Sequence, residues 1–350
     1  MKRILFISPA NSVHSSKWIN FFLLNTNYKI IWISFYKKNQ NLFIDKNIDY
    51  HELSSNSFFK NYLLLKTILK NNYHLVHLHY IGKFSYLLLM FNLKKLVISP
   101  WGSDLKLVKN RSFKFFLVKK IIDKADIITV DADFMKNEIL RFTRKKKNIH
   151  RINFGTDTDV FSYYDRYLQF STLKIISLRN LESIYSISTL IKAAKILKDT
   201  DVAFEIDIYG MGSLKDDLQS LIKSLNLSDS VFLKGKFEYG KLPSILEKYN
   251  LYVSTSITDA GIAASTSEAM STGLIPISAD NSENNFWITK DEGLLFKTSS
   301  PEDLAETIIE FYKLPFSTKV KMSKNSRKRI IDSNSYRNEM NKMLKIYNVE

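Results

Sequence analysis

The stretch TDAGIAASTSEAMSTGLIPISAD, residues 258–280, holds one carboxylate, Glu268, in the middle of a run of small side chains. Small residues such as Gly261 leave the backbone open to a ligand. The run Ser265-Thr266-Ser267 is expected to cap a helix that begins here, with Glu268 in its first turn. A carboxylate in that place can accept hydrogen bonds from a vicinal diol such as a ribose, while the helix amides face phosphate groups. The alternative, that Glu268 only complements the helix dipole, stays open.

Two glycines, Gly210 and Gly212, stand in IYGMGSL, between a strand pattern and a helical pattern. Such a turn can bring backbone N–H groups at a helix N-terminus close to a phosphate. Lys215 occupies the place of the third glycine of a dinucleotide-binding fingerprint. A plain tight turn is therefore an equally good interpretation of these glycines.

The first half of the chain has polar groups at the ends of its own strand patterns. His14 lies in PANSVHSSKW, directly after the first expected strand, and HLHY puts His77 and His79 on one face of a later strand. WGSD ends the next strand with Asp104, which is either a functional acid or a helix N-cap. Two His on one face suggest a metal, but the chain has no Cys and no evident third ligand, so we expect no metal there.

The acid pair in Asp131-Ala132-Asp133 imitates a divalent-metal motif. The pair follows the strand pattern DIITV directly and opens a helical pattern. Helix capping and dipole complementarity explain both acids, and we predict no metal site at this place.

Alternating strands and helices must position these groups. Ten β-rich runs occur along the chain, namely RILFIS, KIIWISF, HLVHLHY, KLVIS, DIITV, LKIISL, FEIDIY, SVFLKG, LYVSTS and LIPISA. Helical patterns separate most of them, which predicts βαβ units and parallel sheets. Ligands bind such sheets beyond the carboxyl ends of the strands.

The polar, turn-rich stretch NFGTDTDVFSYYDR, residues 153–166, divides the strand patterns into two sets. We therefore predict an α/β protein with two Rossmann-like domains, one over residues 1–160 and one over residues 161–335. A last helix over residues 336–350 can pack on either domain, the N-terminal one included. A cleft between the domains would collect the loops of both sheets.

The chain has 350 residues and no Cys, with Lys+Arg 51 against Asp+Glu 35 and a net charge of +16. The absence of Cys fits a reducing compartment such as the cytoplasm. The positive charge favours anionic partners, namely nucleic acid, a membrane surface or a phosphorylated small molecule. No RNA or DNA motif accompanies it, so we expect no nucleic-acid partner. FSYLLLMFNL, the most lipid-like segment, is too short to span a bilayer.

Cations punctuate the apolar stretches SFFKNYLLLKTILKNN and RSFKFFLVKKIIDK, and RFTRKKKNIHR adds a basic cluster. Helices of this kind either pack on the sheet with their Lys in water or lie on an anionic membrane. The first interpretation suits most of these residues. A peripheral contact with a membrane face remains a hypothesis.

Several segments resemble, in order and spacing, the C-terminal half of the family-four retaining glycosyltransferases. These segments are IISLRNLESIYSISTLIKAAKIL, IYGMGSL, VFLKG, LYVSTS, SEAMSTGLIPIS and GLLFKTSSPEDLAETI. INFGTDTDVF is similar to the interdomain segment of that family, and HLHYIG and SPWGSDL resemble its N-terminal half more loosely. The resemblance implies the GT-B fold, with a nucleotide sugar held by the second domain, an acceptor held by the first, and no cofactor or metal.

The donor site follows from this resemblance residue by residue. The family has a motif of two Glu separated by seven residues, and Glu268 is similar to the second of them, which binds the ribose of the donor. Ala260 stands where the first acid belongs, so contact with the sugar hydroxyls would pass to Asp259 and to backbone amides. Arg179 resembles the Arg that pairs with the diphosphate. Phe237 falls where the family recognises the base, or it is a core aromatic.

The companion Lys that the family carries after its Arg is replaced here by Ile184-Tyr185. The resemblance therefore leaves the diphosphate to Arg179, to the turn at Gly210 and Gly212, and to the helix that begins near Ser265.

On the acceptor side, the resemblance implies contacts from His14, Trp101 and Asp104. Trp101 stands where many members carry a His, which leaves Asp104 and His79, with Arg179, as the candidate catalytic residues.

The activity that the resemblance implies is transfer of a sugar from a nucleoside diphosphate sugar, with UDP as the expected carrier. The acceptor would be a hydroxyl of a glycan, a cell-surface polysaccharide or a lipid-linked molecule. The alternative hypothesis is a nucleotide-sugar-binding protein that has lost transfer activity.

Overall fold

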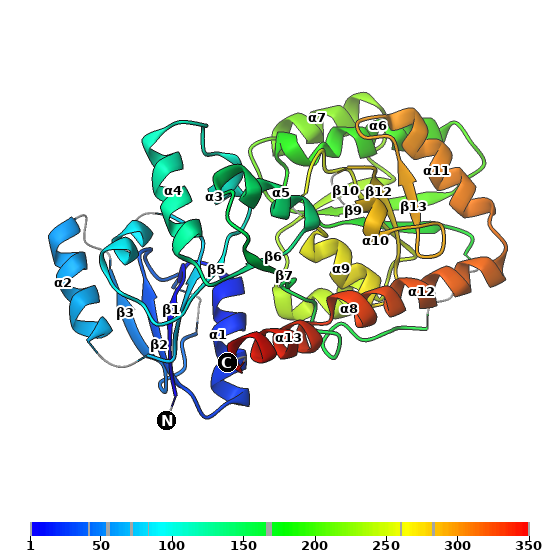
Figure 1. Ribbon diagram of the computed structural model, residues 1–350. Coiled ribbons are helices and arrows are strands. Elements are labelled where there is room, and N and C mark those ends of the chain that lie inside the picture. Colours follow the sequence, from blue (N-terminus) through cyan, green and yellow to red (C-terminus); the bar gives the residue numbers. More distant parts are fainter. Residues whose placement is uncertain are drawn as a thin grey trace. The chain divides into compact units, whose positions relative to one another are not determined.

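The computed structural model describes residues 2–40, 43–53, 57–70, 73–82, 84–165, 170–259, 261–281 and 284–348. The chain forms two compact units (Figure 1). Unit 1 consists of Met1–Phe154 and Glu339–Glu350, and unit 2 of Gly155–Asn338. The first boundary lies within the polar stretch 153–166, and residues from Glu339 onward belong to unit 1.

Unit 1 is built on a parallel sheet with the strand order β3-β2-β1-β4-β5-β6-β7. The described strands are β1 (Arg3–Ile7), β2 (Lys29–Ser34), β3 (Asp49–Glu52), β4 (Leu75–His79), β5 (Leu96–Ser99), β6 (Ile127–Val130) and β7 (Asn148–Arg151). The helices of this part are α1 (Val13–Asn25), α2 (Phe58–Leu69), η1 (Ser85–Met90), α3 (Ser103–Lys106), α4 (Phe113–Lys124), α5 (Asp133–Phe142) and α13 (Tyr336–Asn348), of which η1 is a 3₁₀ helix. The order reverses between β1 and β4, which is where Rossmann-type sheets bind ligands.

Helices cover both faces of this sheet. On one face, apolar side chains of α2, η1, α4 and α5 share a core with the strands, for example Leu65, Leu88 and Ile121. On the other face, Phe22 of α1 and Tyr347 of α13 pack on Phe6 of β1. The nearly continuous apolar runs of the central strands follow from this burial on two sides.

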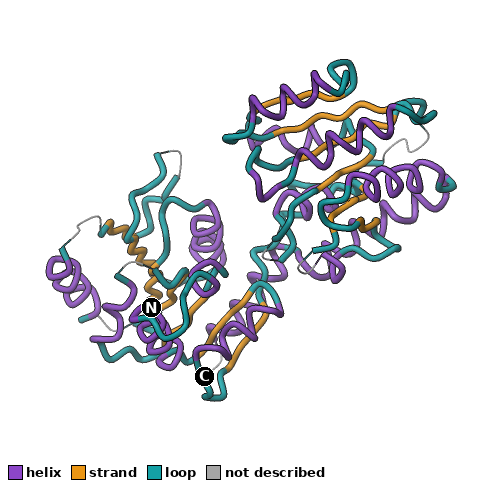
Figure 2. Tube along the Cα trace, turned by 90° about the horizontal axis from the view of Figure 1, so that it is seen from above, coloured by secondary structure: helices purple, strands orange, loops and turns teal. Residues whose placement is uncertain are grey.

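Unit 2 repeats the arrangement of strands flanked by helices (Figure 2). Its parallel strands have the order β10-β9-β8-β11-β12-β13. The strands are β8 (Leu173–Ser177), β9 (Phe204–Tyr209), β10 (Val231–Gly235), β11 (Leu251–Ser254), β12 (Ile275–Ala279) and β13 (Leu294–Phe296). The helices are η2 (Ser183–Tyr185), α6 (Ile187–Lys198), α7 (Lys215–Ser224), η3 (Tyr239–Lys241), α8 (Leu242–Leu246), α9 (Ala264–Ser271), α10 (Asn284–Trp287), α11 (Pro301–Lys313) and α12 (Phe316–Asn334), of which η2 and η3 are 3₁₀ helices. One face of the sheet packs on α6, α7 and α11 and the other on α8 and α9.

The two parallel sheets confirm the predicted pair of Rossmann-like domains. All ten β-rich runs form strands. Three further strands, β3, β7 and β13, have no counterpart among the predicted runs, and each lies at an edge of its sheet. Edge strands are short and have one free side, so their sequences, such as DYHE and NIHR, need few β-branched or apolar residues.

No helix among the described residues combines the length and the apolar character needed to cross a bilayer. The segment FSYLLLMFNL contributes the 3₁₀ helix η1, whose Leu87 and Leu88 are buried in the core of unit 1.

Candidate active site

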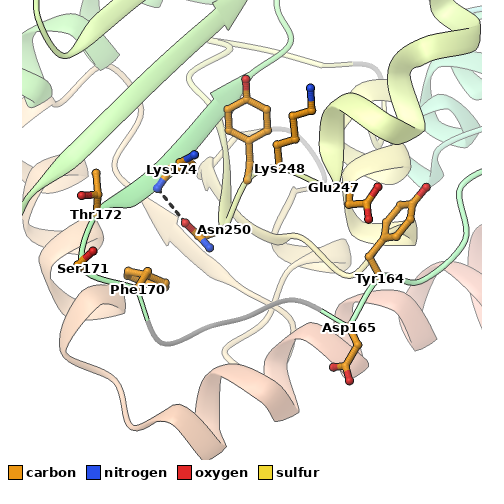
Figure 3. Close-up of a pocket in the computed structure, with 10 residues that line it drawn as sticks. Tyr164, Asp165, Phe170, Ser171, Thr172, Lys174, Glu247, Lys248 and Asn250 are labelled. Atoms are coloured by element: carbon orange, nitrogen blue, oxygen red, sulfur yellow. Dashed lines mark hydrogen bonds between the residues drawn. The ribbon is translucent and has the colours of Figure 1, made fainter.

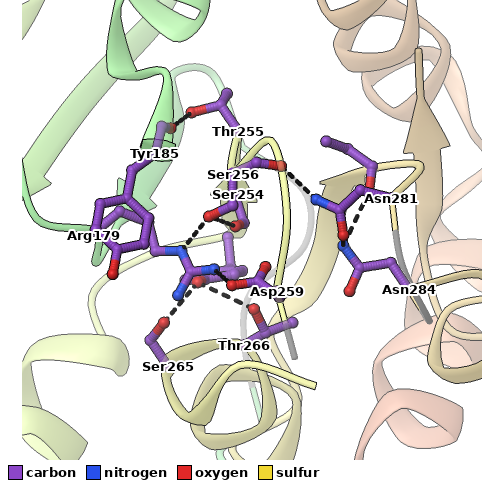
Figure 4. A network of polar contacts seen from close by, with 12 residues as sticks. Arg179, Tyr185, Ser254, Thr255, Ser256, Asp259, Ser265, Thr266, Asn281 and Asn284 are labelled. Atoms are coloured by element: carbon purple, nitrogen blue, oxygen red, sulfur yellow. Dashed lines mark hydrogen bonds and ion pairs between the residues drawn. The ribbon is translucent and has the colours of Figure 1, made fainter. Parts of the chain in front are cut away.

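Arg179 lies in the loop that follows β8 and is almost buried, with 8% of its surface exposed. Its Nε donates to Ser256 Oγ at 2.8 Å, and its guanidinium forms an ion pair with Asp259 (Figure 4). The ring of Tyr185 lies 5.1 Å from the guanidinium carbon. Burial by itself would lower the pKa of Arg179, but the Tyr252 hydroxyl and the Asp259 carboxylate outweigh it and raise the pKa above its usual value. The residue is a fixed cation.

The fold explains this position. Strands β8 and β11 are neighbours in the sheet of unit 2, and the strand order reverses between them. Arg179 follows β8, while Ser256 and Asp259 follow β11, so the pair forms at the carboxyl ends of the two strands. Two further hydrogen bonds join the loops: Ile257 N donates to Ile184 O at 2.9 Å, and Thr255 Oγ1 donates to Tyr185 O at 2.8 Å. Ile184 and Tyr185 thereby hold the loops together.

Helix α9 begins at Ala264, and its N-cap is Ala263, which makes no side-chain capping bond. The expected cap at Ser265-Thr266-Ser267 is therefore wrong, because these hydroxyls have other partners. Ser265 Oγ lies 2.9 Å from Tyr252 Oη, to which Thr266 Oγ1 donates at 3.2 Å, and Ser267 Oγ donates to Ala264 O at 2.9 Å. The start of α9 thus has no side-chain cap within the described residues, and Ala260, just upstream, lies outside them.

Glu268 lies in the second turn of α9, one turn later than expected. It is 7% exposed, and one carboxylate oxygen accepts a hydrogen bond of 2.5 Å from the hydroxyl of Tyr239 in η3. Burial, followed by the charge of Glu268, raises the pKa of Tyr239. Tyr239 therefore stays protonated and donates to the carboxylate. Because half of Tyr239 is exposed, this bond lies at the edge of the solvent.

The loop after β8 passes so close to Gly210 and Gly212 that neither position has room for a Cβ. A Cβ on Gly210 would lie 2.2 Å from Arg179 O, and a Cβ on Gly212 would lie 2.3 Å from Leu181 O. The amides of this turn also have partners inside the protein: Gly210 N donates to Gly235 O, Leu214 N to Leu181 O, and Ser213 N to the Glu182 side chain. These contacts support the tight-turn interpretation, in which the glycines let the turn clamp the Arg179 loop.

This clamp leads to a stability prediction. The change Gly212→Ala is expected to lower the free energy of unfolding by about 2–4 kcal/mol, because the new methyl group meets a backbone carbonyl that cannot move away cheaply. Urea denaturation followed by circular dichroism measures the loss. The change Gly240→Ala is the matched control, since a Cβ there meets nothing within 4 Å. Equal stability of the two variants would contradict the prediction.

Phe237 and Gly261 complete the expected donor residues. Phe237 follows β10 and is half-buried against the core that α8 and α9 share, with its ring 5.9 Å from that of Tyr209. This packing is what the core-aromatic interpretation expects, and recognition of the base by Phe237 stays a prediction. Gly261 is buried and has φ of 121°, a backbone conformation that residues with a Cβ rarely adopt.

In unit 1, His14 and Trp101 lie together. His14 is exposed at the start of α1, where its backbone N–H donates to the N-cap Ser12 at 3.2 Å. Its ring lies 6.4 Å from that of Trp101 and 4.5 Å from that of Phe154. These residues follow the carboxyl ends of β1, β5 and β7, so the three loops form one aromatic surface on unit 1.

His77 and His79 are both buried in β4, with their rings 4.3 Å apart. His77 bonds Tyr347 of α13 through Nδ1 and Ser99 through Nε2, the latter at 2.7 Å. His79 Nδ1 bonds Ser8 at 2.9 Å, while its Nε2 has no partner among the described residues. Burial lowers the pKa of His79 to about 3, so its ring is neutral. The pair stabilises the core of unit 1 and anchors the last helix.

Asp104 is fully buried in the first turn of α3. One carboxylate oxygen accepts from Trp101 N at 2.9 Å and the other from Ile81 N at 2.7 Å. The N-cap of α3 is Gly102, so Asp104 is not the cap. Its carboxylate instead joins the loops that follow β4 and β5, and thereby holds the backbone of Trp101.

The Asp104 carboxyl also predicts a pH effect. Burial raises its pKa from 3.8 to about 6. A proton bound more tightly by the folded state adds stability below the unfolded pKa, and this stability is lost as pH rises through the folded pKa. Over the whole titration this group should cost about 3 kcal/mol of unfolding free energy, at 1.36 kcal/mol per pKa unit, and about 2 kcal/mol of this loss falls between about pH 4 and about pH 6.

The measurement is urea denaturation of the wild type and Asp104→Asn across this pH range. The Asn variant lacks the titrating group, so the stability difference between the two proteins should change by about the same amount over the interval. Parallel pH profiles would contradict the assigned ionisation.

The acids Asp131 and Asp133 do not come together with a third ligand. Asp133 lies in the first turn of α5, as expected, and pairs with Lys136 and Arg151, each at 2.6 Å. The N-cap of α5 is Ala132, which makes no side-chain capping bond. Across the described residues, no three His, Asp or Glu side chains are grouped so that they could hold a metal ion.

A pocket of unit 2 lies elsewhere. It has a volume of about 590 Å³ and is lined by residues that include Tyr164, Lys174, Glu247 and Asn250 (Figure 3). Lys174 is the second residue of β8 and Asn250 directly precedes β11, so this pocket lies at the amino ends of the strands, opposite the edge that carries Arg179. Parallel sheets bind their ligands at the carboxyl edge, and we assign no donor to this pocket.

Sequence reasoning did not find two residues that hold the site. Ser256 ends the polar run Ser254-Thr255-Ser256, which begins at the last residue of β11, and polar residues at the carboxyl end of a central strand were an available signal. Tyr239 had no such signal, because its contact with Glu268 joins two segments 29 positions apart.

Two Rossmann-type sheets, each with its functional loops at the carboxyl strand ends, define the GT-B class of glycosyltransferases. Family models match in both halves: "Glycosyl transferases group 1" over residues 171–329 and "Glycosyl transferase 4-like" over residues 3–132. Both halves of the chain are thus similar to glycosyltransferase families. The resemblance recognised from sequence is thereby confirmed.

Two curated relatives are similar over part of the chain. The poly(ribitol-phosphate) alpha-N-acetylglucosaminyltransferase of Staphylococcus aureus is 29% identical over 183 residues, which cover 51% of this chain and 36% of the relative. The putative colanic acid biosynthesis glycosyltransferase WcaL of Escherichia coli is 23% identical over 218 residues, which cover 61% and 54%. The matches thus span about a third to a half of the length of these relatives.

Solved structures agree in fold over nearly the whole chain. A glycosyltransferase from Rickettsia africae superposes with a TM-score of 0.81 at 19% identity and covers 99% of this chain and 97% of its own. HepE of Anabaena, solved in complex with UDP and glucose, gives a TM-score of 0.76 at 12% identity and covers 100% of both chains.

Proposed function

We propose that this protein transfers a sugar from a nucleoside diphosphate sugar, with UDP as the expected carrier, to a hydroxyl of a glycan, cell-surface polysaccharide or lipid-linked acceptor. The observation that carries the proposal is the buried Arg179 at the carboxyl edge of the sheet in unit 2, in the same domain as the buried Glu268. The names of the matched relatives, which include two enzymes of glycan synthesis, support the acceptor class.

In this proposal unit 2 holds the donor. Glu268, kept in place by Tyr239, accepts hydrogen bonds from the ribose hydroxyls. Arg179 and the uncapped amides at the start of α9 receive the diphosphate. Gly261 leaves room for the donor to approach the backbone.

Arg179 is the group that we assign to the chemical step. The bond between the anomeric carbon and the diphosphate oxygen breaks, and negative charge grows on the leaving diphosphate. A preorganised guanidinium lowers the energy of this charge. The acceptor oxygen attacks on the same face, and its proton passes to a diphosphate oxygen, so the anomeric configuration is retained. Arg179 and the amides stabilise the negative charge that develops on the diphosphate, and no metal takes part in the proposed step.

Asp259 has two parts in this scheme. Before the donor binds, it neutralises Arg179. A bidentate diphosphate competes for the same guanidinium, and Asp259 is then available to accept hydrogen bonds from the sugar. It would take over the task of the acid that is missing at position 260.

Unit 1 is proposed to hold the acceptor on the aromatic surface of His14 and Trp101. Aromatic rings offer an apolar face to the C–H side of a sugar. Both oxygens of Asp104 are used by backbone amides, and His79 is buried, so we assign them the positioning of Trp101 and of the loop after β1.

The experiment is a thermal-shift screen with nucleoside diphosphates and their sugars, because a ligand bound by the folded state raises the melting temperature. The best donor is then incubated with glycan acceptors, and the product anomer is assigned by NMR. A rise with UDP and an α-linked product from an α-linked donor would support the proposal. No response to any nucleotide would exclude it.

The second candidate is a protein that binds nucleotide sugars without transferring them. The Arg179–Asp259 pair favours it, because a neutralised guanidinium is a weaker partner for the diphosphate. Such a protein would bind UDP but release none from any UDP-sugar, with or without an acceptor.

A further inference from the structure

Most of the exposed large apolar side chains of unit 1 lie on one layer of helices, while Val13, Leu24 and Phe43 lie elsewhere. We call the outer layer the helices α2, η1, α3, α4 and α5, which share one core on one face of the sheet. Its exposed large apolar residues are Phe58, Phe59, Leu63, Met90, Leu107, Phe113, Phe116 and Leu140. Phe113 is 77% exposed and Leu107 75% exposed. Grouped exposure of this kind marks an interaction surface more often than scattered single residues do.

The centre of the outer layer is strongly basic. Residues 105–122 contain six cations, Lys106, Lys109, Arg111, Lys114, Lys119 and Lys120, and no acid. All of them except Lys119 are exposed. Lys119 pairs with Asp123 at 3.2 Å, and Lys120 lies over the ring of Phe116 at 5.2 Å. Cations therefore flank the exposed Phe113 and Phe116 along the chain, and one of them, Lys120, lies over the ring of Phe116.

A basic hollow continues this surface between α4 and α5. It has a volume of about 470 Å³, and the residues that line it include Lys119, Leu140, Arg144 and Lys145. Arg144 and Lys145 are exposed and follow the end of α5. The hollow is thus lined by both apolar and cationic side chains.

This chemistry selects one class of partner. Two copies of the layer would repel each other, because each brings the same cations. A nucleic acid would stack on aromatic rings, but it gives Leu107 and Leu140 no apolar partner. An anionic lipid surface satisfies both features, since cations attract the headgroup phosphates and apolar side chains enter the boundary with the acyl chains.

We propose that the outer layer of unit 1 docks on an anionic lipid bilayer, with Phe113 and Phe116 entering the headgroup region and the flanking cations on lipid phosphates. This contact needs no donor and no transfer, so it goes beyond the proposed function. It would bring unit 1, where we place the acceptor, to a surface that carries lipid-linked molecules.

The test is flotation of the purified full chain with lipid vesicles. One set is phosphatidylcholine alone, and the other has about one third phosphatidylglycerol, which makes the surface negative. We expect binding to the anionic set only, with loss at high salt, because screening shortens the reach of the charges. The variant Phe113→Ser/Phe116→Ser should bind at least about tenfold more weakly, since it removes the inserted apolar groups.

A matched pair separates this layer from charge in general. Lys109→Glu/Lys114→Glu should abolish binding, whereas Lys321→Glu/Lys324→Glu, with exposed lysines of α12 in unit 2, should leave most of it. The replaced side chains are exposed, and melting temperatures near that of the wild type verify that each variant is folded.

Three results would overturn the proposal. The first is no binding of the wild type to anionic vesicles at low salt. The second is equal binding by Phe113→Ser/Phe116→Ser. The third is a dimer in light scattering that this variant breaks, because the layer would then cover a second copy. UDP-dependent thermal shifts are measured on the same samples, so loss of lipid binding is distinguished from failure of the donor site.

Discussion

Replacing Arg179 by Ala is expected to lower kcat for sugar transfer by about 10²–10³-fold, the range seen when one preorganised donor to a developing negative charge is removed. The guanidinium is 8% exposed and is fixed by Ser256, Asp259 and Tyr185. It therefore needs little rearrangement as charge grows on the leaving diphosphate. Because that charge is larger in the transition state than in the bound donor, kcat should fall more than KM rises.

The measurement is steady-state kinetics of UDP release and product formation. Arg179→Lys keeps a charge without the planar fork, so its kcat should lie between those of the wild type and Arg179→Ala. Arg144→Ala, an exposed Arg of unit 1, is the matched control and should keep wild-type kcat. An unchanged kcat of the Arg179→Ala enzyme would show that Arg179 does not stabilise the leaving diphosphate.

A merely structural Arg179 would behave differently. Its removal leaves Asp259 buried without its ion-pair partner, which lowers stability. A structural role alone would thus lower the melting temperature and leave the folded fraction fully active. Kinetics below the melting transition, normalised to folded protein, distinguish the two cases.

The sequence predicts the strands that build the site better than the contacts within it. The central strands carry apolar runs because both of their faces are buried. These runs can be recognised from the local sequence without knowledge of the neighbouring strands. The edge strands β3 and β13 are short, and their pairing depends on a neighbour rather than on their own composition. The sequence of an edge strand does not show which strand it pairs with.

The same limit applies to single residues. Arg179 and Asp259 are 80 positions apart, and their pairing arises because β8 and β11 are adjacent. The resemblance to the family gave Asp259 as a candidate but not its partner. The expected cap of α9 failed because Ser265 and Thr266 have Tyr252 as an alternative hydrogen-bond partner. Side-chain hydroxyls compete for such partners, and the competition is decided by tertiary structure.

Replacing Glu268 by Ala should weaken UDP binding by about 10–100-fold, because hydrogen bonds from ribose hydroxyls to a carboxylate are lost, each worth about 1.5–3 kcal/mol. Isothermal titration with UDP measures the change. Asp131→Ala, which alters the acid pair of unit 1, should leave the affinity unchanged. The opposite pattern would overturn the assignment of the donor site to unit 2.

A comparison of UDP with its 2′-deoxy analogue tests the role of the carboxylate directly. The wild type should prefer UDP by about tenfold, since the deoxy ligand lacks one hydroxyl for Glu268. Glu268→Ala should bind both ligands with similar affinity, because the partner of that hydroxyl is gone. If Glu268 served only the dipole of α9, both proteins would prefer UDP equally. The double comparison therefore separates ribose recognition from helix stabilisation, even if the Ala variant is also less stable.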